Sequence, residues 1–426
     1  MARFVHDFLK SSVVERNVMR TAFFWTLLIL SLSSAGATLL PAFPVLAQSS
    51  PDGAPPAPVR DLRVEGATEA TFARGFFIPT HFPITDSVAG ILNDRFDVII
   101  VGVEANQSLI DPLKTALIAG PAMTYSNSVA MPDDWAVIDA HEDWFLHSSP
   151  LSSPETRIPL SGPYPYLFYM DVGSQGWRDF VVGKYAASLS AAPAADGVFL
   201  DGVMSPDGYE SHLGSAYPGY DATAYQGAAL EFIYAVKDAA AGKLLVVNSE
   251  LAKAFTLAAD GASCEGFVHF GGQRNDEQIT EYQWLRHLSV IGDRDFDDRL
   301  LLVGSGSLDS TLAPMVEYCY ASFLLGYNQH ARSRFYWHSN ADGGYSKINW
   351  LPVWEMDIGD PVGDYYEAEG AYRRDFTDGT VVVNPNDSGS PVTVNLGAVH
   401  TDSSGGNVST VTLPNKSGAV LKKYYW

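Results

Sequence analysis

Two apolar runs that each end in an aspartate, with a helical segment between them, constrain the fold of this chain most. The run 166–170 stops at Asp171, and the run 198–200 stops at Asp201. Between them, apolar side chains recur at three- and four-residue steps from Trp177 to Leu189, which predicts a helix. Because parallel strands joined by a helix end at the same edge of a sheet, we expect Asp171 and Asp201 to lie side by side there.

Each aspartate also has a purely structural explanation. Aspartate is common in turns, especially before glycine, and it often caps the helix that follows. For Asp171 or Asp201 taken alone, this alternative stays open, and only the rest of the chain indicates that they act together.

Strand and helix patterns alternate on both sides of this unit. About eight strands that alternate with helices predict a parallel barrel or a doubly wound sheet. No glycine-rich phosphate-binding motif follows the first strand, which disfavours a dinucleotide-binding fold. We therefore predict an α/β fold in which residues 71–365 form a (β/α)8 TIM barrel. The other strand patterns lie at 72–79, 95–103, 121–125, 243–247, 257–265, 299–303 and 334–338.

The last sixty residues have a different pattern. From Arg373 onward, short strands of alternating apolar and polar residues are separated by Asn, Asp, Gly and Pro. This spacing is typical of antiparallel sheets. We expect a small antiparallel β-sandwich domain over residues 366–426.

The first 47 residues have the features of a signal peptide. Basic residues precede the apolar run 22–32, and Val45 and Ala47 fit the small-residue pattern before a cleavage site. An uncleaved anchor is the alternative, although Ser, Gly and Pro dilute the apolar span. Residues 48–70 are rich in Pro, Ser and Ala and predict a flexible linker. We expect a secreted or cell-surface protein with no stable membrane insertion after cleavage.

The charge and the cysteine count limit the possible partners. The chain has 27 Lys and Arg against 49 Asp and Glu, a net charge of −22 that disfavours nucleic acid as a partner. Only Cys264 and Cys319 are present, so one disulfide between them stays open. Neither these cysteines nor the 10 histidines show metal-binding spacing. We expect no metal and no cofactor.

Two carboxyl groups at predicted strand ends suit the hydrolysis of a glycosidic bond. That reaction needs one protonated carboxyl to donate to the leaving oxygen and one ionised carboxyl to attack or to activate water. Asp201 is our candidate for the nucleophile or base. Glu265 is the candidate acid, because Cys264 and the residues 266–267 favour its neutral form, and the reverse assignment stays open. A serine hydrolase is disfavoured, since residues 304–308 depart from the Gly-x-Ser-x-Gly motif.

Five further residues are candidates for substrate binding. Asn127 and Asn248 follow predicted strands, Asp171 ends the run described first, and Glu142 lies in a long loop over 138–159. Trp144 in the same loop would stack on a sugar ring. The alternative for Trp144 is that it packs the loop against the protein.

Several segments together resemble the glycoside hydrolases called glycosyl hydrolase-like family fifteen. The resemblance rests on MDVGSQGWRDFVVGKYA, DGVFLDGV, ADGASCEGF, WEMDIGDPVGDYY, RRDFTDGTVVVNP and LPNKSGAVLKK. It implies a (β/α)8 barrel with a C-terminal β-sandwich from about Phe72 to the C-terminus. The resemblance also implies an Asp at the end of the strand that contains residues 199–200, which is Asp201 here. It further implies a Glu in a DGxxxE pattern, which residues 260–265 fit.

Taken together, these features indicate an exported glycoside hydrolase. We expect it to cleave an O-glycosidic bond of an oligosaccharide or polysaccharide with Asp201 and Glu265. Two alternatives stay open, namely a barrel that binds carbohydrate without cutting it and a cell-surface structural protein.

Overall fold

A barrel of parallel strands forms the larger part of the protein. In a computed structural model, eight strands pair in the order β1 to β8, and β1 also contacts β8, which confirms the predicted barrel. The strands are β1 (Gly75–Ile78), β2 (Val98–Val101), β3 (Ala122–Asn127), β4 (Gly197–Asp201), β5 (Leu244–Asn248), β6 (Gly261–Cys264), β7 (Leu300–Ser307) and β8 (Arg332–Ser339). The structure describes residues 75–78, 90–92, 95–101, 121–128, 135–149, 152–160, 167–205, 221–240, 242–269, 279–307, 313–339 and 351–425.

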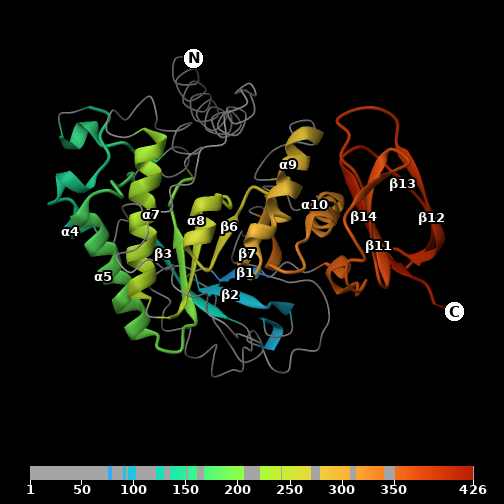
Figure 1. The fold of residues 1–426 in the computed structure, drawn as a ribbon, viewed down its shortest axis with the longest axis horizontal. Helices are drawn as coiled ribbons and strands as arrows, with labels where there is room; N and C mark the ends of the chain where they lie inside the picture. The colour runs from blue at the N-terminus through green and yellow to red at the C-terminus, as the bar shows by residue number, and fades with distance from the viewer. Residues whose placement is uncertain are drawn as a thin grey trace, which may run out of the picture. The chain divides into compact units, whose positions relative to one another are not determined.

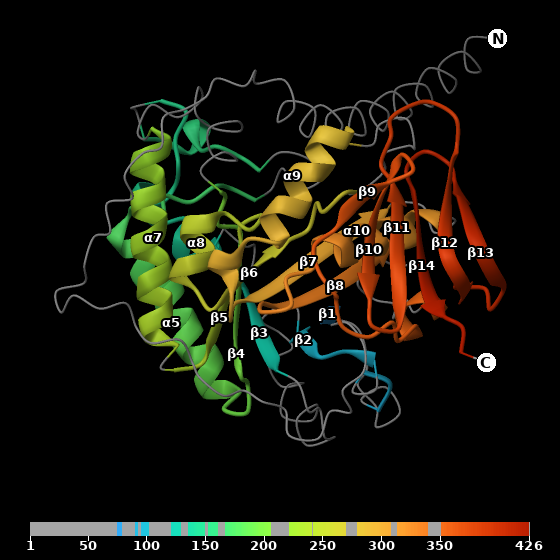
Figure 2. The ribbon, with the colours of Figure 1, turned by 45° about the vertical axis from the view of Figure 1, so that its right-hand side comes forward.

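Helices connect the strands from β3 onward (Figure 1). The helices α5 and α7 run side by side in Figures 1 and 2, and Arg178 Nη1 of α5 lies 2.6 Å from Glu231 Oε2 of α7. A capping box starts α9, since Thr280 and Gln283 exchange side-chain and backbone hydrogen bonds. The α-helices are α4 (Trp135–Ile138), α5 (Gln175–Ala191), α7 (Ala222–Ala239), α8 (Lys253–Ala258), α9 (Glu281–Ile291) and α10 (Ala313–Gly326), and 3-10 helices span Glu142–Trp144, Pro154–Thr156, Arg294–Phe296 and Pro352–Glu355.

Alternate residues of each strand fill the inside of the barrel. Successive side chains of a strand point to opposite faces, so one row faces inward and the other faces the helices. The inward row on β4 contains Phe199, and Asp201 ends that row. The interior cluster consists of Val98, Ile100, Met123, Phe199, Leu244, Val246, Leu300, Leu302 and Tyr336, with Tyr125 packed against it.

The prediction that residues 166–170 form a barrel strand is wrong. β3 pairs directly with β4, with Asn127 opposite Asp201, so no strand lies between them. Residues 167–170 instead make antiparallel bridges, Phe168 with Pro159 and Met170 with Phe145. Leu167 and Met170 of this run are buried, and the run belongs to an inserted unit that contains residues 129–171, a compact unit distinct from the barrel. Asp171 does not end a barrel strand.

A six-stranded antiparallel sheet ends the chain (Figure 2). Its pairing order is β13-β12-β14-β11-β10-β9, and one face encloses a core of its own that includes Val382, Val394 and Leu421. The strands are β9 (Tyr366–Ala368), β10 (Ala371–Phe376), β11 (Gly379–Asn384), β12 (Val392–Thr401), β13 (Asn407–Leu413) and β14 (Ser417–Lys423). This sheet is the predicted C-terminal β domain.

The other face of this sheet packs against the barrel through α10. Val381, Val383 and Val420 share one buried cluster with residues of α9 and α10. The guanidinium of Arg374, which is 7 % exposed, donates to the carbonyl oxygens of Leu324, Leu325 and Tyr327 at 3.1, 2.9 and 2.8 Å. These bonds satisfy carbonyl groups at the C-terminal end of α10, which have no partner within the helix. The barrel and the β domain thus form one packed unit.

Three other sequence-based expectations concern the cysteines, the first 70 residues and membrane insertion. Cys264 and Cys319 are both buried free thiols, so the disulfide that the sequence left open is not formed. The signal peptide (1–47) and the linker (48–70) lie outside the described residues. Within the part of the chain that the structure describes, no helix has the length and apolar character to cross a membrane.

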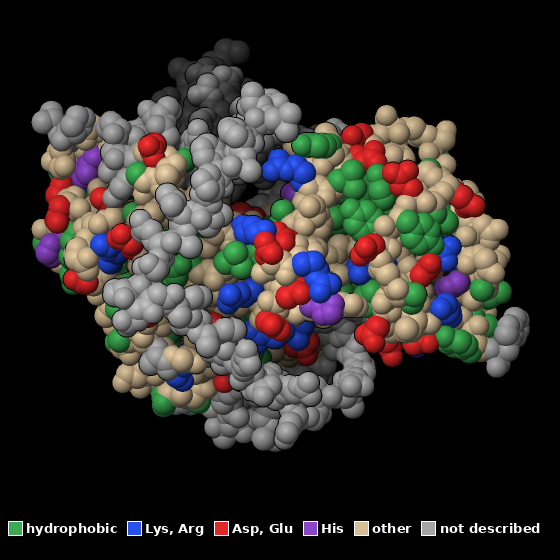
Figure 3. Space-filling model, in the orientation of Figure 1, with side chains coloured by type: hydrophobic (Ala, Val, Ile, Leu, Met, Phe, Trp, Pro, Cys, Tyr) green, Lys and Arg blue, Asp and Glu red, His purple; other side chains and the backbone are tan. Residues whose placement is uncertain are grey.

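Charges of both signs are mixed on the surface. On the face drawn in Figure 3, basic side chains lie next to acidic ones. The described ion pairs include Lys253 with Asp293 at 2.9 Å and Arg294 with Asp297 at 3.1 Å. Exposed pairs of this kind each contribute only about 0 to 1 kcal/mol to stability.

Candidate active site

Four of the predicted site residues meet at the carboxyl ends of β3 to β6. Asn127, Asp201 and Asn248 are the last residues of β3, β4 and β5, and each continues the inward row of its strand. Glu265 directly follows β6. The parallel register places Asn127 opposite Asp201 and Asn248 opposite Ser263, so the polar ends of four neighbouring strands lie at one level. This edge is where barrel enzymes carry their catalytic groups.

Three hydrogen-bond donors converge on the carboxylate of Asp201. Tyr125 Oη donates to Oδ2 at 2.5 Å, Asn248 Nδ2 donates to Oδ1 at 2.9 Å, and the backbone N–H of Gly202 donates to Oδ1 at 2.7 Å. Burial and the charge of Asp201 raise the pKa of Tyr125 well above its usual value, so the phenol keeps its proton and remains a donor. The donors fix the orientation of Asp201 and stabilise its negative charge.

The environment of Glu265 favours its protonated form. Burial raises the pKa of Glu265 to about 8, and the neighbouring charges of Asp201 and Glu250 act in the same direction. A hydrogen bond from Asn248 opposes this shift. Asn248 therefore contacts both Asp201 and Glu265. The site thus holds Asp201, whose carboxyl group accepts three hydrogen bonds, beside Glu265, whose surroundings favour the protonated carboxyl.

Tyr125 and Glu250 belong to this cluster, and the sequence did not single them out. Tyr125 lies two residues before Asn127, on the same inward row of β3, and Asn127 Nδ2 donates to its Oη at 3.1 Å. Glu250 follows β5 by two residues and accepts hydrogen bonds from Cys264 Sγ at 3.0 Å and from the backbone N–H of Glu265 at 3.4 Å. Period-two spacing from Asn127 was the available signal for Tyr125, whereas Glu250 lies beyond β5 in a left-handed turn that no strand periodicity predicts.

The serine at 305 is not placed as a nucleophile. Ser305 has no exposed surface, and its hydroxyl donates to the carbonyl oxygen of Phe267. The neighbouring Gly304 leaves room for the ring of Tyr336, because a Cβ at residue 304 would lie 2.2 Å from Tyr336 Cζ. This segment of β7 therefore shapes the inside of the barrel. Its role agrees with the sequence-based argument against a serine hydrolase.

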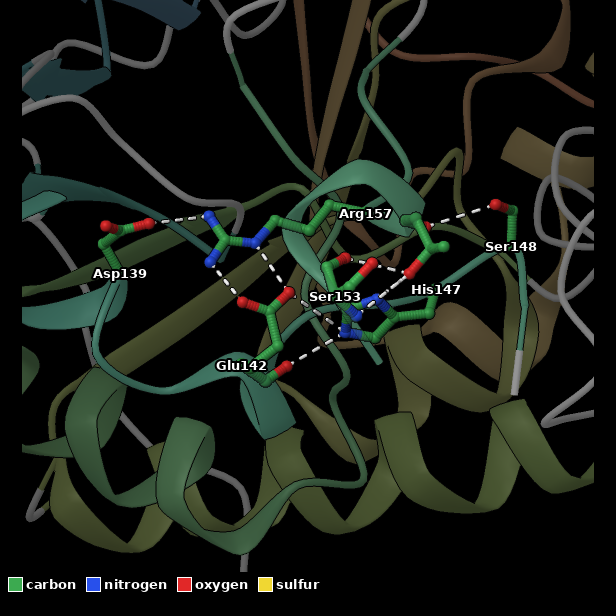
Figure 4. A network of polar contacts seen from close by, with 7 residues as sticks. Asp139, Glu142, His147, Ser148, Ser153 and Arg157 are labelled. Atoms are coloured by element: carbon green, nitrogen blue, oxygen red, sulfur yellow. Dashed lines mark hydrogen bonds and ion pairs between the residues drawn. The ribbon is translucent and has the colours of Figure 1, made fainter. Parts of the chain in front are cut away.

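The predicted sugar ligand Glu142 is held by an arginine within the inserted unit (Figure 4). Arg157 Nε donates to Glu142 Oε1 at 2.8 Å, and a second guanidinium nitrogen pairs with Oε2. The Arg157 side chain is 3 % exposed and stacks over the Phe145 ring at 3.9 Å. A buried guanidinium requires a counter-ion, which Glu142 and Asp139 supply. The described contacts thus give Glu142 a structural role.

Trp144 is buried rather than exposed. Its side chain is 7 % exposed and stacks on His141, with ring centroids 4.0 Å apart and planes inclined by 5°. The expectation of an open stacking face is wrong, and the packing alternative describes Trp144. Asp171 lies in the same unit, where its backbone N–H donates to the carbonyl oxygen of Trp144 at 2.8 Å. Glu142, Trp144 and Asp171 therefore form part of the inserted unit.

The described side chains offer little for metal binding. Among the residues that the structure describes, no group of three or more His, Cys, Asp or Glu side chains has the geometry to hold a metal ion. The chemistry available in the barrel site is that of carboxyl, amide, phenol and thiol groups.

Comparison with known families gives one match. Residues 121–380, more than half of the chain, match the family described as hypothetical glycosyl hydrolase family 15. The match covers β3 to β8 and the first strands of the β domain, and it includes Asp201, Glu250 and Glu265. No curated protein matches the chain.

Several solved structures are similar at low identity. A maltogenic α-amylase, AmyB from Thermotoga neapolitana, is 10% identical, with 83% of this chain and 99% of that chain covered and a TM-score of 0.46. The glycoside hydrolase domain of PelA from Pseudomonas aeruginosa is 13% identical, with 62% and 94% covered and a TM-score of 0.43. Ega3 from Aspergillus fumigatus, in complex with galactosamine, is 11% identical, with 63% and 91% covered and a TM-score of 0.41. Likenesses at this level carry no conclusion about this chain.

The raised pKa of Glu265 predicts that the stability of the folded protein depends on pH. Below about pH 4.3 both the folded and the unfolded chain hold this proton, whereas between that pH and about 8 only the folded chain does. The free energy of unfolding should therefore fall with rising pH, by at most about 1.4 kcal/mol per pH unit from this group. Glu265→Gln removes the titration, so the variant should be more stable than the parent at pH 8 and nearly equal at pH 4.5.

Urea unfolding of both proteins at pH 4.5, 6 and 8 measures this difference. Glu231→Gln on α7 is the control, because the Glu231 side chain is 67% exposed. A stability difference between parent and Glu265→Gln that stays constant with pH would show that Glu265 titrates normally.

Proposed function

The chain belongs to hypothetical glycosyl hydrolase family 15, and on this premise we propose that it is an exported enzyme that uses Asp201 and Glu265 to cleave an O-glycosidic bond. The substrate class is an oligosaccharide or polysaccharide. One observation carries the proposal. Two carboxyl groups share one cluster, and their surroundings favour charge on one and a proton on the other.

Glu265 is the proposed general acid. An acid that works near neutral pH must keep its proton until the glycosidic oxygen needs it, and a pKa of about 8 meets this requirement. Protonation of the leaving oxygen lets the bond to the anomeric carbon break without expelling an alkoxide. The carboxyl of Glu265 becomes a carboxylate in this step and takes up a proton again before the next turnover.

Asp201 is the proposed nucleophile or base. Its carboxylate either attacks the anomeric carbon or removes a proton from the attacking water, and both roles need negative charge at the start. Hydrogen bonds from Tyr125, Asn248 and Gly202 hold that charge in place. The separation of the two carboxyls distinguishes the roles, since retaining pairs lie about 5 to 5.5 Å apart and inverting pairs about 6.5 to 9.5 Å apart.

The amide side chains support the two carboxyls. Asn248 contacts Asp201 and Glu265, and Asn127 contacts Tyr125, which in turn holds Asp201. We propose that these amides orient the catalytic groups and also reach sugar hydroxyls. Asp171 stays a proposed sugar contact of the inserted unit, while Glu142 and Trp144 are engaged by Arg157 and His141.

Asp201→Asn should abolish hydrolysis and leave the fold intact. The amide has nearly the same volume but cannot attack or accept a proton, so release of reducing ends from a polysaccharide panel should fall at least about a thousandfold. The assay uses the chain from Gln48 onward. Asp179→Asn on α5 is a matched control at an exposed carboxylate and should keep parent activity. An active, stable Asp201→Asn protein would overturn the role, and binding without cleavage by the parent would favour the non-catalytic alternative.

Glu265→Gln should show a dependence on the leaving group. The variant should lose activity on natural glycosides but keep much more of it on activated aryl glycosides, which depart without protonation. In the parent, kcat/KM should fall above about pH 8, where Glu265 loses its proton. Rates on a series of aryl glycosides with different leaving groups measure the effect. Equal loss of activity on all of them would exclude Glu265 as the acid.

The proposed export can be tested through cleavage of the signal peptide. When the full chain is expressed in a bacterium, the processed protein should begin at Gln48, because Ala47 provides the small residue that signal peptidase requires. Ala47→Arg should block processing and leave the longer chain attached to the membrane. Intact mass of the exported and the membrane fractions distinguishes these forms. A parent chain that stays full-length in the membrane would identify residues 1–47 as an anchor.

A further inference from the structure

Glu250 has a backbone conformation that few residues adopt. Its φ is 52°, and that of the next residue, Leu251, is 56°. Two consecutive left-handed residues without glycine are unfavourable, and such strain persists only where surrounding contacts fix it. Here the carbonyl oxygen of Ser263 on β6 accepts from the backbone N–H groups of Ser249 and Leu251, both at 3.3 Å. The turn after β5 is thus tied to β6.

The side chain of Glu250 spans the end of β6. Its Oε2 accepts from Cys264 Sγ at 3.0 Å, and its Oε1 accepts from the backbone N–H of Glu265 at 3.4 Å. Burial and the charge of Glu250 raise the pKa of the Cys264 thiol, so the thiol remains a donor. One carboxylate therefore bonds two consecutive residues, the second of which is the proposed acid.

We propose that Glu250 is a positioning residue for Glu265, fixing the backbone on which the acid stands and placing a negative charge against its carboxyl. This inference rests on the proposed function of Glu265. The turn after β5 supports this role, because its left-handed residues are held against β6 by the hydrogen bonds from Ser249 and Leu251 to Ser263.

The charges around Glu265 come from several elements. Asp201 of β4 and Glu250 after β5 both disfavour a second negative charge on Glu265, and Asn248 of β5 opposes them through a hydrogen bond. Among the residues that the structure describes, Tyr125 of β3 and Cys264 of β6 are further titratable groups of this cluster, and both keep their protons. Burial also raises the pKa of Glu250, whereas hydrogen bonds from the Cys264 thiol and from the backbone N–H groups of Glu265 and Gly266 lower it and favour the charge on Glu250.

The test is the pH profile of Glu250→Gln. The substitution keeps the shape and one acceptor oxygen but removes the charge, so Glu265 should lose its proton at lower pH. We expect the alkaline limb of kcat/KM on a cleavable substrate to move down by roughly one pH unit, with KM changed less than about twofold. Glu231→Gln should leave the limb unchanged. An unmoved limb in a folded Glu250→Gln protein would overturn the proposal.

Two further measurements distinguish a positioning role of Glu250 from a role as the acid itself. Glu250→Asp keeps the negative charge but shortens the side chain, so kcat should fall. The pH at which kcat/KM declines on the alkaline side should shift less in this variant than in Glu250→Gln. This variant also serves if Glu250→Gln fails to fold. Loss of activity in Glu250→Gln at about pH 5, where Glu265 keeps its proton in both proteins, that aryl glycosides with good leaving groups restore would show that Glu250 is the acid itself, which overturns the positioning role. Full activity of Glu265→Gln would instead refute the proposed function.

Discussion

Closure of a parallel sheet is the constraint on which the rest of this structure depends. Because all eight strands run in one direction, their carboxyl ends meet at one edge, and alternate side chains must point inward. The inward rows of β3, β4 and β5 are apolar until their last residues, which are Asn127, Asp201 and Asn248. The barrel thus separates its stability, which comes from the apolar interior, from its polar chemistry at the strand ends.

The polar cluster brings like charges together at the cost of stability. Asp201, Glu250 and Glu265 repel one another when ionised, and the protein accommodates them in three different ways. Tyr125, Asn248 and a backbone N–H engage Asp201, a thiol and a backbone N–H engage Glu250, and Glu265 keeps its proton. Groups that destabilise the folded chain in this way are common at sites where function requires them.

The parts outside the barrel interior have contacts of their own. The C-terminal sheet is joined to α10 by a shared apolar cluster and by Arg374, whose guanidinium replaces the hydrogen bonds that the end of a helix lacks. The inserted unit is organised around Arg157, which Glu142 and Asp139 neutralise and Phe145 covers. In both places a buried arginine links segments that are distant in the sequence, since its several donors can satisfy several acceptors at once.

The sequence by itself determined the class of fold, the place of the β domain and the strand ends at Asp201 and Asn248, because apolar runs and their lengths are local properties. It also supplied the family resemblance, which the family match confirms. Only the tertiary structure decided which strands are neighbours. It showed that Asp171 ends no barrel strand, packed Trp144 against His141 and brought Tyr125 and Glu250 to the carboxyl cluster. Pairing, register and a left-handed turn depend on contacts between residues far apart in the chain, and no local pattern encodes them.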